Sequence, residues 1–148
     1  LNALKLGVLQ ELGLEEGLKD LLNTWQSRHP KINFHYQVNL KALTNINETV
    51  SITSYRIIQE CLTNISRHAK AKNVEININY YKKNKSSTFI DIEVIDDGVG
   101  FSKSHRDGFG LSGMRERINE INGKINIMSE LNQGVKLKIK LPILKKKK

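Results

Sequence analysis

The chain has 148 residues, of which 39% are hydrophobic and 26% charged, so it is expected to form one globular domain. The formal net charge is +9, but residues 145–148 supply four of these charges, and no basic helix carries interleaved aromatic residues. Direct nucleic-acid binding is therefore not expected. A single cysteine excludes an intrachain disulfide, and no apolar run reaches the roughly 18 residues of a membrane span.

Hydrophobic spacing predicts alternating helices and strands. A helix over residues 9–27, which Gly13 separates from an earlier helical piece, precedes a strand over 31–38 and a long helix over 51–69. Two strands, a loop, a helix and two more strands follow, over residues 74–81, 88–96, 98–107, 111–122, 124–129 and 135–142. This order predicts an α/β two-layer sandwich, with a mixed, mostly antiparallel sheet and helices packed on one face.

The long helix has two different faces. The expected buried stripe is Tyr55, Ile58, Leu62, Ile65 and Ala69, and the opposite face holds Arg56, Glu60, Asn64, Arg67 and His68. A solvated surface is the simplest interpretation of the second set. However, Asn64 is a poor mid-helix residue and lies one turn after Glu60, an arrangement of oxygen ligands that suits Mg²⁺. With a cation and a ring nearby, this face suits a nucleotide.

The strand over residues 88–96 ends with a carboxylate on the side that should be buried. Alternation places Asp96 on the same face as Ile92 and Val94. A carboxylate at the edge of a core needs a hydrogen-bond donor, and an adenine amino group is a suitable one. The following "DDGVG" explains a turn, and its glycines also allow the backbone to approach a flat ring closely.

The segment "GFGLSG" (residues 108–113) matches G-x-G-x-x-G and opens a helix, which is a suitable phosphate site. A dinucleotide-binding fold is the alternative, and Glu130 even lies near the expected offset of about 20 residues. That fold requires a strand directly before the first glycine, whereas the polar "SKSHRD" stands there. The Walker sequence of P-loop ATPases is absent.

Four motifs in order resemble the ATP-binding domain of two-component sensor histidine kinases, a fold shared with gyrase B, Hsp90 and MutL. The similarity covers nearly the whole chain and is greatest to the nitrate and sugar-phosphate sensor subfamily. "YRIIQECLTNISRHAKA" resembles the N box, "DDGVG" the G1 box, "GFGLSGMRERI" the G2 box and "NQGVKLKIKLP" the closing strand.

The resemblance implies roles for individual residues. Asp96 would accept a hydrogen bond from the adenine amino group, with Gly98 and Gly100 shaping the base pocket. Asn64 would bind Mg²⁺, and Glu60 would act as base on the histidine that receives the phosphoryl group. Arg67 and His68 would contact phosphate and base. Residues 101–107 would form the ATP lid. The following residues would hinge the lid, contact the phosphates or line the pocket: Gly108, Gly110, Leu111, Gly113 and Met114.

The resemblance also implies a place in a larger protein. Residues 1–13 would end a dimerisation and phosphoacceptor region, residues 14–144 would be the kinase catalytic domain, and residues 145–148 a basic tail. The chain would transfer the γ-phosphoryl group of Mg-ATP to a histidine outside this sequence, for relay to an aspartate of a DNA-binding response regulator. The full-length protein would be a homodimer, with this domain in the cytoplasm and the parent in the inner membrane.

Two departures from the family pattern keep alternatives open. Val135 follows Gly134 where threonine is usual, and no histidine here fits the acceptor pattern, so the acceptor helix is expected before Leu1. The histidines considered are His29, His35, His68 and His105. The alternatives are a nucleotide-binding regulatory module without transfer activity, and an ATPase or protein-serine kinase of the same fold.

Overall fold

The computed structural model describes residues 3–41, 43, 46–84, 86–100 and 111–143. The elements are α1 (Ala3–Arg28), β1 (Asn33–Asn39), α2 (Glu48–Asn64), η1 (Ile65–Ala69), β2 (Asn73–Asn84), β3 (Ser87–Asp96), α3 (Leu111–Glu120), β4 (Lys124–Ser129) and β5 (Val135–Ile143). Their types and order confirm the prediction, and most boundaries move by a few residues. The exception is η1, a five-residue π-helix that continues α2 and that no pattern in the sequence indicated.

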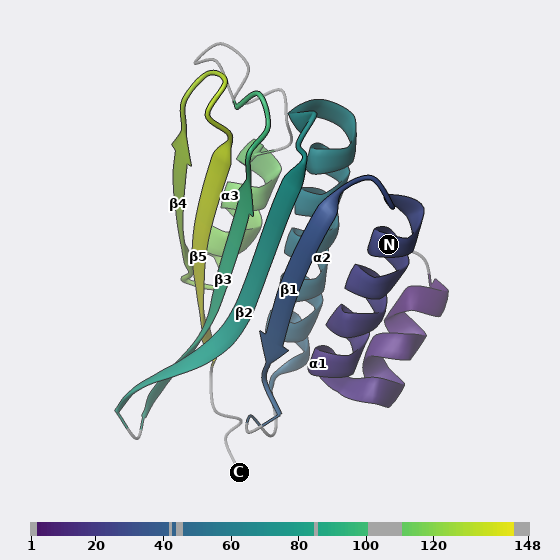
Figure 1. Ribbon diagram of the computed structural model, residues 1–148. Coiled ribbons are helices and arrows are strands. Elements are labelled where there is room, and N and C mark those ends of the chain that lie inside the picture. Colours follow the sequence, from purple (N-terminus) through teal and green to yellow (C-terminus); the bar gives the residue numbers. More distant parts are fainter. Residues whose placement is uncertain (1–2, 42, 44–45, 85, 101–110, 144–148) are drawn as a thin grey trace.

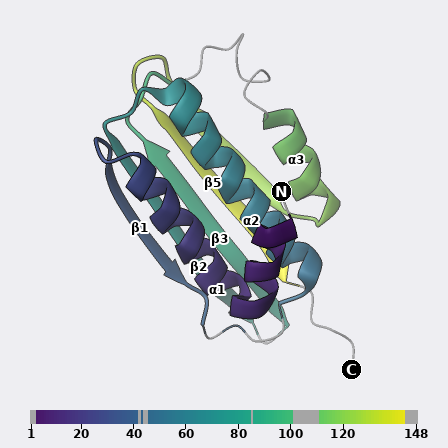
Figure 2. The same cartoon turned by 90° about the vertical axis from the view of Figure 1, so that its right-hand side faces the viewer.

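The five strands form one sheet in the order β1-β2-β3-β5-β4. β1 and β2 pair in parallel because α2 crosses between them, and the remaining pairs are antiparallel. The helices lie on one face of the sheet, as two views at right angles show (Figures 1 and 2). The predicted α/β two-layer sandwich, with a mixed and mostly antiparallel sheet, is therefore confirmed.

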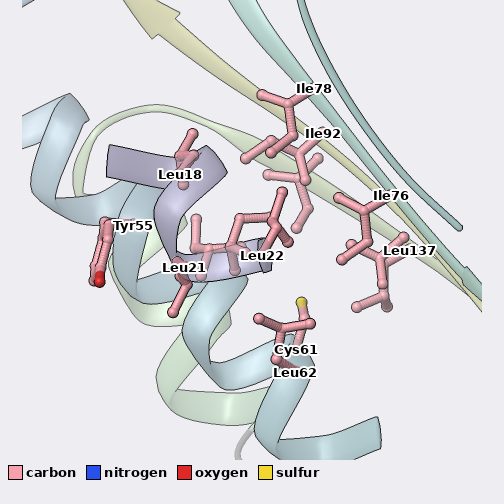
Figure 3. Close-up of a cluster of buried hydrophobic side chains, with 14 of the residues drawn as sticks. Leu18, Leu21, Leu22, Tyr55, Cys61, Leu62, Ile76, Ile78, Ile92 and Leu137 are labelled. Atoms are coloured by element: carbon pink, nitrogen blue, oxygen red, sulfur yellow. The ribbon is translucent and has the colours of Figure 1, made fainter. Parts of the chain in front are cut away.

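The core lies between the sheet and the helices. Side chains from α1 and α2 point toward Ile76, Ile78, Ile92 and Leu137 of the sheet (Figure 3). Every member of the stripe predicted for the long helix, which α2 and η1 together form, is buried, from Tyr55 to Ala69. Because strand residues alternate between faces, this packing fixes which strand residues point toward the helices, and Asp96 is one of them.

The long first helix is two helices joined at Gly13, which has a φ of 81°. This confirms the predicted break, since a positive φ is readily adopted only by glycine. The second piece packs against the core through Leu18 and Leu22, neither of which has any exposed surface. Among the described residues, no helix combines the length and hydropathy needed to cross a bilayer.

Candidate functional site

A small pocket, with a cavity volume of about 20 Å³ and partly open to solvent, lies between the end of the α2–η1 helix and strands β3 and β5. Its walls are mainly apolar, and its polar groups come from few positions. The lining residues are Cys61, Asn64, Ile65, His68, Ala69, Val94, Asp96, Gly100, Leu111, Val135 and Leu137. The structure thus brings together residues from all four sequence motifs, with Val135 and Leu137 coming from the fourth, although the motifs are separated widely along the chain.

Asp96 is the buried acid of this pocket, with 7% of its surface exposed. It is the last residue of β3, lies opposite Val135 of β5, and its Oδ1 accepts a hydrogen bond from the Gly98 amide at 2.9 Å. Burial raises the pKa of this carboxyl, and the nearby charge of Asp97 adds to the effect, while hydrogen bonds from the Gly98 and Val135 amides oppose it. A buried carboxylate in this position is suited to bind a hydrogen-bond donor of a ligand that is otherwise apolar.

Gly98 allows the chain after Asp96 to pack directly against the end of η1. A Cβ atom on Gly98 would lie 2.0 Å from the carbonyl oxygen of Ala69. The same oxygen accepts a hydrogen bond from the Val99 amide at 2.7 Å. Glycine is therefore required here by close backbone approach, although Gly98 itself is not among the residues that line the pocket.

Asp97, adjacent to the buried acid, has a structural role instead. Its Oδ1 accepts hydrogen bonds from the backbone amides of Lys72 and Asn73, both at 2.8 Å, and its Oδ2 accepts one from Asn73 Nδ2 at 2.7 Å. Burial acts to raise the pKa of Asp97, but these hydrogen bonds outweigh it and lower the pKa. Of the two acids in "DDGVG", one anchors the loop and the other faces the pocket.

The helical side of the site is a change of helix type. Asn64 ends α2, and Arg67 and His68 lie in η1. Lys70 follows η1 as its C-cap residue, with a φ of 50°. A π-helical turn widens the helix and turns its side chains away from the positions that α-helical spacing gives, and such turns are frequent at functional sites. Asn64 and His68 line the pocket, whereas Arg67 is exposed and is not among the lining residues.

The segment η1 is held from behind by α1. The hydroxyl of Ser66 accepts a hydrogen bond from Trp25 Nε1 at 2.9 Å and lies 3.0 Å from His29 Nε2. The Trp25 and His29 rings stack with centroids 4.2 Å apart, and His29 Nδ1 lies 2.8 Å from the Trp25 carbonyl oxygen. Sequence reasoning considered His29 only as a phosphoacceptor candidate, and only the fold places it against η1.

Glu60 lies one turn before Asn64 on α2 and outside the residues that line the pocket. Its Oε1 forms an ion pair with Nη1 of Arg117, which comes from α3. Its Oε2 is buried and has no hydrogen-bond partner among the described residues. No pattern in the sequence joins Arg117 to Glu60, because the two residues lie on helices that are distant in the chain.

The remaining predicted residues fall in different places. Leu111 lines the pocket, whereas Met114 is fully buried and is not among the lining residues. Gly113 borders a separate groove between α2 and α3. Gly108, Gly110 and the predicted lid over residues 101–107 lie outside the described residues.

Six lining residues were not among the predicted site residues: Cys61, Ile65, Ala69, Val94, Val135 and Leu137. Burial raises the pKa of Cys61 to about 12, with the charges of Glu60 and Asp96 adding to the effect, so this thiol is a neutral, apolar part of the wall. Val94 was recoverable from the sequence, since it lies two residues before Asp96 and alternation puts both on one face.

Comparisons with known proteins agree with this geometry. The family described as "Histidine kinase-, DNA gyrase B-, and HSP90-like ATPase" matches residues 49–145. The chain is 32% identical over 142 residues to the sensor histidine kinase LiaS of Bacillus subtilis, covering 95% of this chain and 37% of that protein. It is also 32% identical over 138 residues to the oxygen sensor histidine kinase NreB of Staphylococcus carnosus, covering 91% and 38%. The chain therefore spans little more than a third of the length of these relatives.

Solved structures show the same fold. The histidine kinase domain of the Erythrobacter litoralis blue-light activated histidine kinase superposes with a TM-score of 0.69 at 15% identity, covering 88% of this chain and 61% of that chain. Together with the family match over residues 49–145, these comparisons identify the chain as a member of the histidine kinase-, DNA gyrase B- and HSP90-like ATPase family.

Proposed function

We propose that this chain is the catalytic domain of a sensor histidine kinase. It binds ATP in the pocket beside Asp96 and transfers the γ-phosphoryl group to a histidine of another domain. The observation that carries the proposal is a single buried carboxylate, 7% exposed, at the edge of an otherwise mainly apolar pocket. Family membership and the similarity to sensor histidine kinases over most of this chain support it.

Adenine matches the chemistry of this pocket. It is a flat, weakly polar ring with one exocyclic amino group, which needs an acceptor when it is desolvated. Ile65, Val94 and Leu137 supply apolar wall, and the carboxylate of Asp96 supplies the acceptor.

The phosphates would extend from the base toward Asn64. Among the described residues, no group of three or more histidine, cysteine or acidic side chains is arranged to hold a metal. A Mg²⁺ ion bound with its nucleotide needs no such group, since it takes most ligands from phosphate oxygens and water. Asn64 would add one amide oxygen, and the ion would offset phosphate charge. We propose that Arg67 contacts the phosphates.

The reaction forms one bond and breaks one. A nitrogen lone pair of the acceptor imidazole forms a bond to the γ-phosphorus, and the bond from that phosphorus to the bridging oxygen breaks. ADP leaves with the electron pair. Glu60 would accept the proton that the other ring nitrogen releases, and because positioning dominates such transfers, the placement of this carboxylate matters as much as its basicity.

The larger protein would supply what this chain lacks. We propose that it contributes the phosphoacceptor histidine on a dimerisation domain, that it functions as a homodimer, and that a DNA-binding response regulator receives the phosphoryl group. Similarity to named sensor kinases supports these partners. We place this domain in the cytoplasm, where ATP is found, as part of a membrane-bound parent.

A nucleotide-binding regulatory module is the second candidate. Two observations favour it: Glu60 is paired with Arg117, and Val135 in the pocket wall provides no hydroxyl group. In that case nucleotide would bind but no phosphoryl group would be transferred. The two candidates therefore differ in one measurable step.

Calorimetric titration with Mg-ADP tests the binding step. Asp96→Asn is expected to weaken binding at least tenfold, because adenine recognition loses its charged acceptor. Asp91→Asn is the matched control, since Asp91 lies on the same strand but lines the opposite face of the sheet. Equal affinities for the Asp96 variant and the parent would refute the proposed base site.

Radiolabelled ATP tests the transfer step. The acceptor domain of the full-length protein is added to this chain. The unsubstituted chain is expected to label the acceptor, whereas the Glu60→Gln variant is expected not to, although both bind Mg-ADP. Binding without transfer in the parent sequence would leave the regulatory module as the function.

A further inference from the structure

We propose that Arg117 is a positioning residue that orients the proposed base, Glu60, and connects its orientation to the nucleotide pocket. This inference rests on the proposed function, because it assumes that Glu60 receives the proton of the acceptor imidazole. It assigns a role to a residue of α3 that sequence reasoning did not single out.

The contact joins two helices that meet beside the pocket. Nη1 of Arg117 reaches Oε1 of Glu60, and the two side chains are 36% and 32% exposed. A glutamate has a long, freely rotating side chain, and an ion pair to a second helix restricts it to one arrangement. The guanidinium group is suited to this role because it is planar and its donors have fixed directions.

The contact also gives the two carboxylate oxygens of Glu60 different surroundings. Oε1 is occupied by Arg117, while Oε2 is buried and has no hydrogen-bond partner among the described residues. A buried oxygen without a donor is unfavourable in the resting state, and it retains the lone pairs that can accept a proton. We infer that Oε2 is the oxygen that receives the imidazole proton while Arg117 holds Oε1.

The position of Arg117 on its helix adds the connection to the nucleotide. α3 begins at Leu111, which is 1% exposed and lines the pocket, and Arg117 lies less than two turns further along the same helix. A change in the position of α3 when nucleotide fills the pocket would therefore move the guanidinium group that holds the base. One rigid helix links the two parts of the site.

Stability and transfer separate this role from a structural one. An ion pair with both side chains about one-third exposed contributes little to stability, because water screens it. Arg117→Gln is thus expected to leave the urea unfolding midpoint unchanged. Its affinity for Mg-ADP should stay within twofold of that of the unsubstituted chain. Its rate of phosphoryl transfer to the added acceptor domain is expected to fall about 10- to 100-fold, since small misplacements of catalytic groups have effects of this size.

Two further variants complete the comparison. Arg117→Lys keeps the charge without the planar group and is expected to recover part of the lost rate. Arg115→Gln is the matched control, since Arg115 is exposed on the same helix, and its transfer rate is expected to equal that of the parent. If Arg117→Gln does not fold, Arg117→Lys alone tests the inference. A transfer rate equal to that of the unsubstituted chain would then contradict the role assigned to the planar guanidinium group.

The double variant Glu60→Gln with Arg117→Gln tests whether Arg117 acts through Glu60. Transfer by the double variant is expected to equal that of Glu60→Gln alone, because no carboxylate remains to be oriented. An additional loss would assign Arg117 an independent action and overturn the inference. Unchanged transfer in Glu60→Gln would instead contradict the proposed base. Loss in Glu60→Gln with full activity in Arg117→Gln would contradict the inference alone.

Discussion

Replacing Gly98 with alanine tests how the nucleotide pocket is assembled. The added Cβ would lie 2.0 Å from the Ala69 carbonyl oxygen, and real contacts of this kind are essentially never under 3.0 Å. The loop and the end of η1 must therefore separate by at least about 1 Å, since both atoms of the clash are attached to backbone. The hydrogen bond from the Val99 amide to the same oxygen, 2.7 Å long, would be lost.

The magnitude follows from these two effects. The lost hydrogen bond contributes about 0.5–1.5 kcal/mol, and forcing an extra carbon into a packed contact costs about 1–3 kcal/mol. The free energy of unfolding should fall by about 2–4 kcal/mol. With a urea m-value of about 2 kcal/mol/M, the unfolding midpoint moves down by about 1–2 M. Mg-ADP affinity should fall as well, because the moved loop directly follows Asp96, the last residue of β3.

The matched control is Gly113→Ala. A Cβ on Gly113 meets no atom within 4 Å, and this residue lies within α3. Alanine there is expected to raise the free energy of unfolding by about 0.4–1 kcal/mol. Urea unfolding followed by circular dichroism measures both variants. An unchanged midpoint in Gly98→Ala would refute the close packing of the loop on η1.

Three further changes should alter stability. Because burial raises the pKa of Asp96 in the folded state, ionisation of this carboxyl opposes folding. Without nucleotide, Asp96→Asn should therefore have a higher melting temperature than the unsubstituted chain at pH 7, and this difference should disappear below about pH 4. Ser66→Ala leaves the Trp25 indole N–H without its acceptor and should cost about 1 kcal/mol in a urea titration. Glu15→Ala removes the oxygen that accepts from the Leu40 amide at 2.7 Å and should cost about 1–3 kcal/mol at pH 7. Burial acts to raise the pKa of Glu15, but the Leu40 amide and nearby lysines lower it. The stability lost in Glu15→Ala, followed by thermal melts, should therefore shrink as the pH falls below about 4.

Neighbouring residues provide the controls for these changes. Ser27 is exposed and bonds only locally, to the Thr24 carbonyl oxygen among the described contacts, and Glu16 is about half exposed. Alanine at either position should change the free energy of unfolding by less than about 0.5 kcal/mol. A Ser66→Ala variant no less stable than Ser27→Ala would contradict the contact between α1 and η1. Equal losses of stability in Glu15→Ala and Glu16→Ala would contradict the buried hydrogen bond from the Leu40 amide to Glu15.

Most of the fold was predictable because each element carries a clear local pattern. Alternation in β3 placed Ile92, Val94 and Asp96 on one face, and helical spacing in α2 placed Tyr55 and Leu62 on the buried stripe. The order of strands in the sheet and the parallel pairing of β1 with β2 were not stated in advance, because they depend on contacts between distant segments.

The site was predictable in part for the same reason. Asp96 and Gly98 appear in the sequence as departures from a regular pattern, and such departures mark functional positions. The π-helix, the support of Ser66 by α1 and the pairing of Arg117 with Glu60 all depend on tertiary contacts. Spacing along the chain holds no signal for them.

The central claim is that the buried carboxylate of Asp96 recognises a purine base. Mg-ADP titration of Asp96→Asn beside Asp91→Asn, each checked for folding, tests it most directly. The account predicts parent-like affinity in the Asp91 variant and at least a tenfold loss in the Asp96 variant. Equal affinity in both variants, or no measurable nucleotide binding by the folded parent chain, would contradict it.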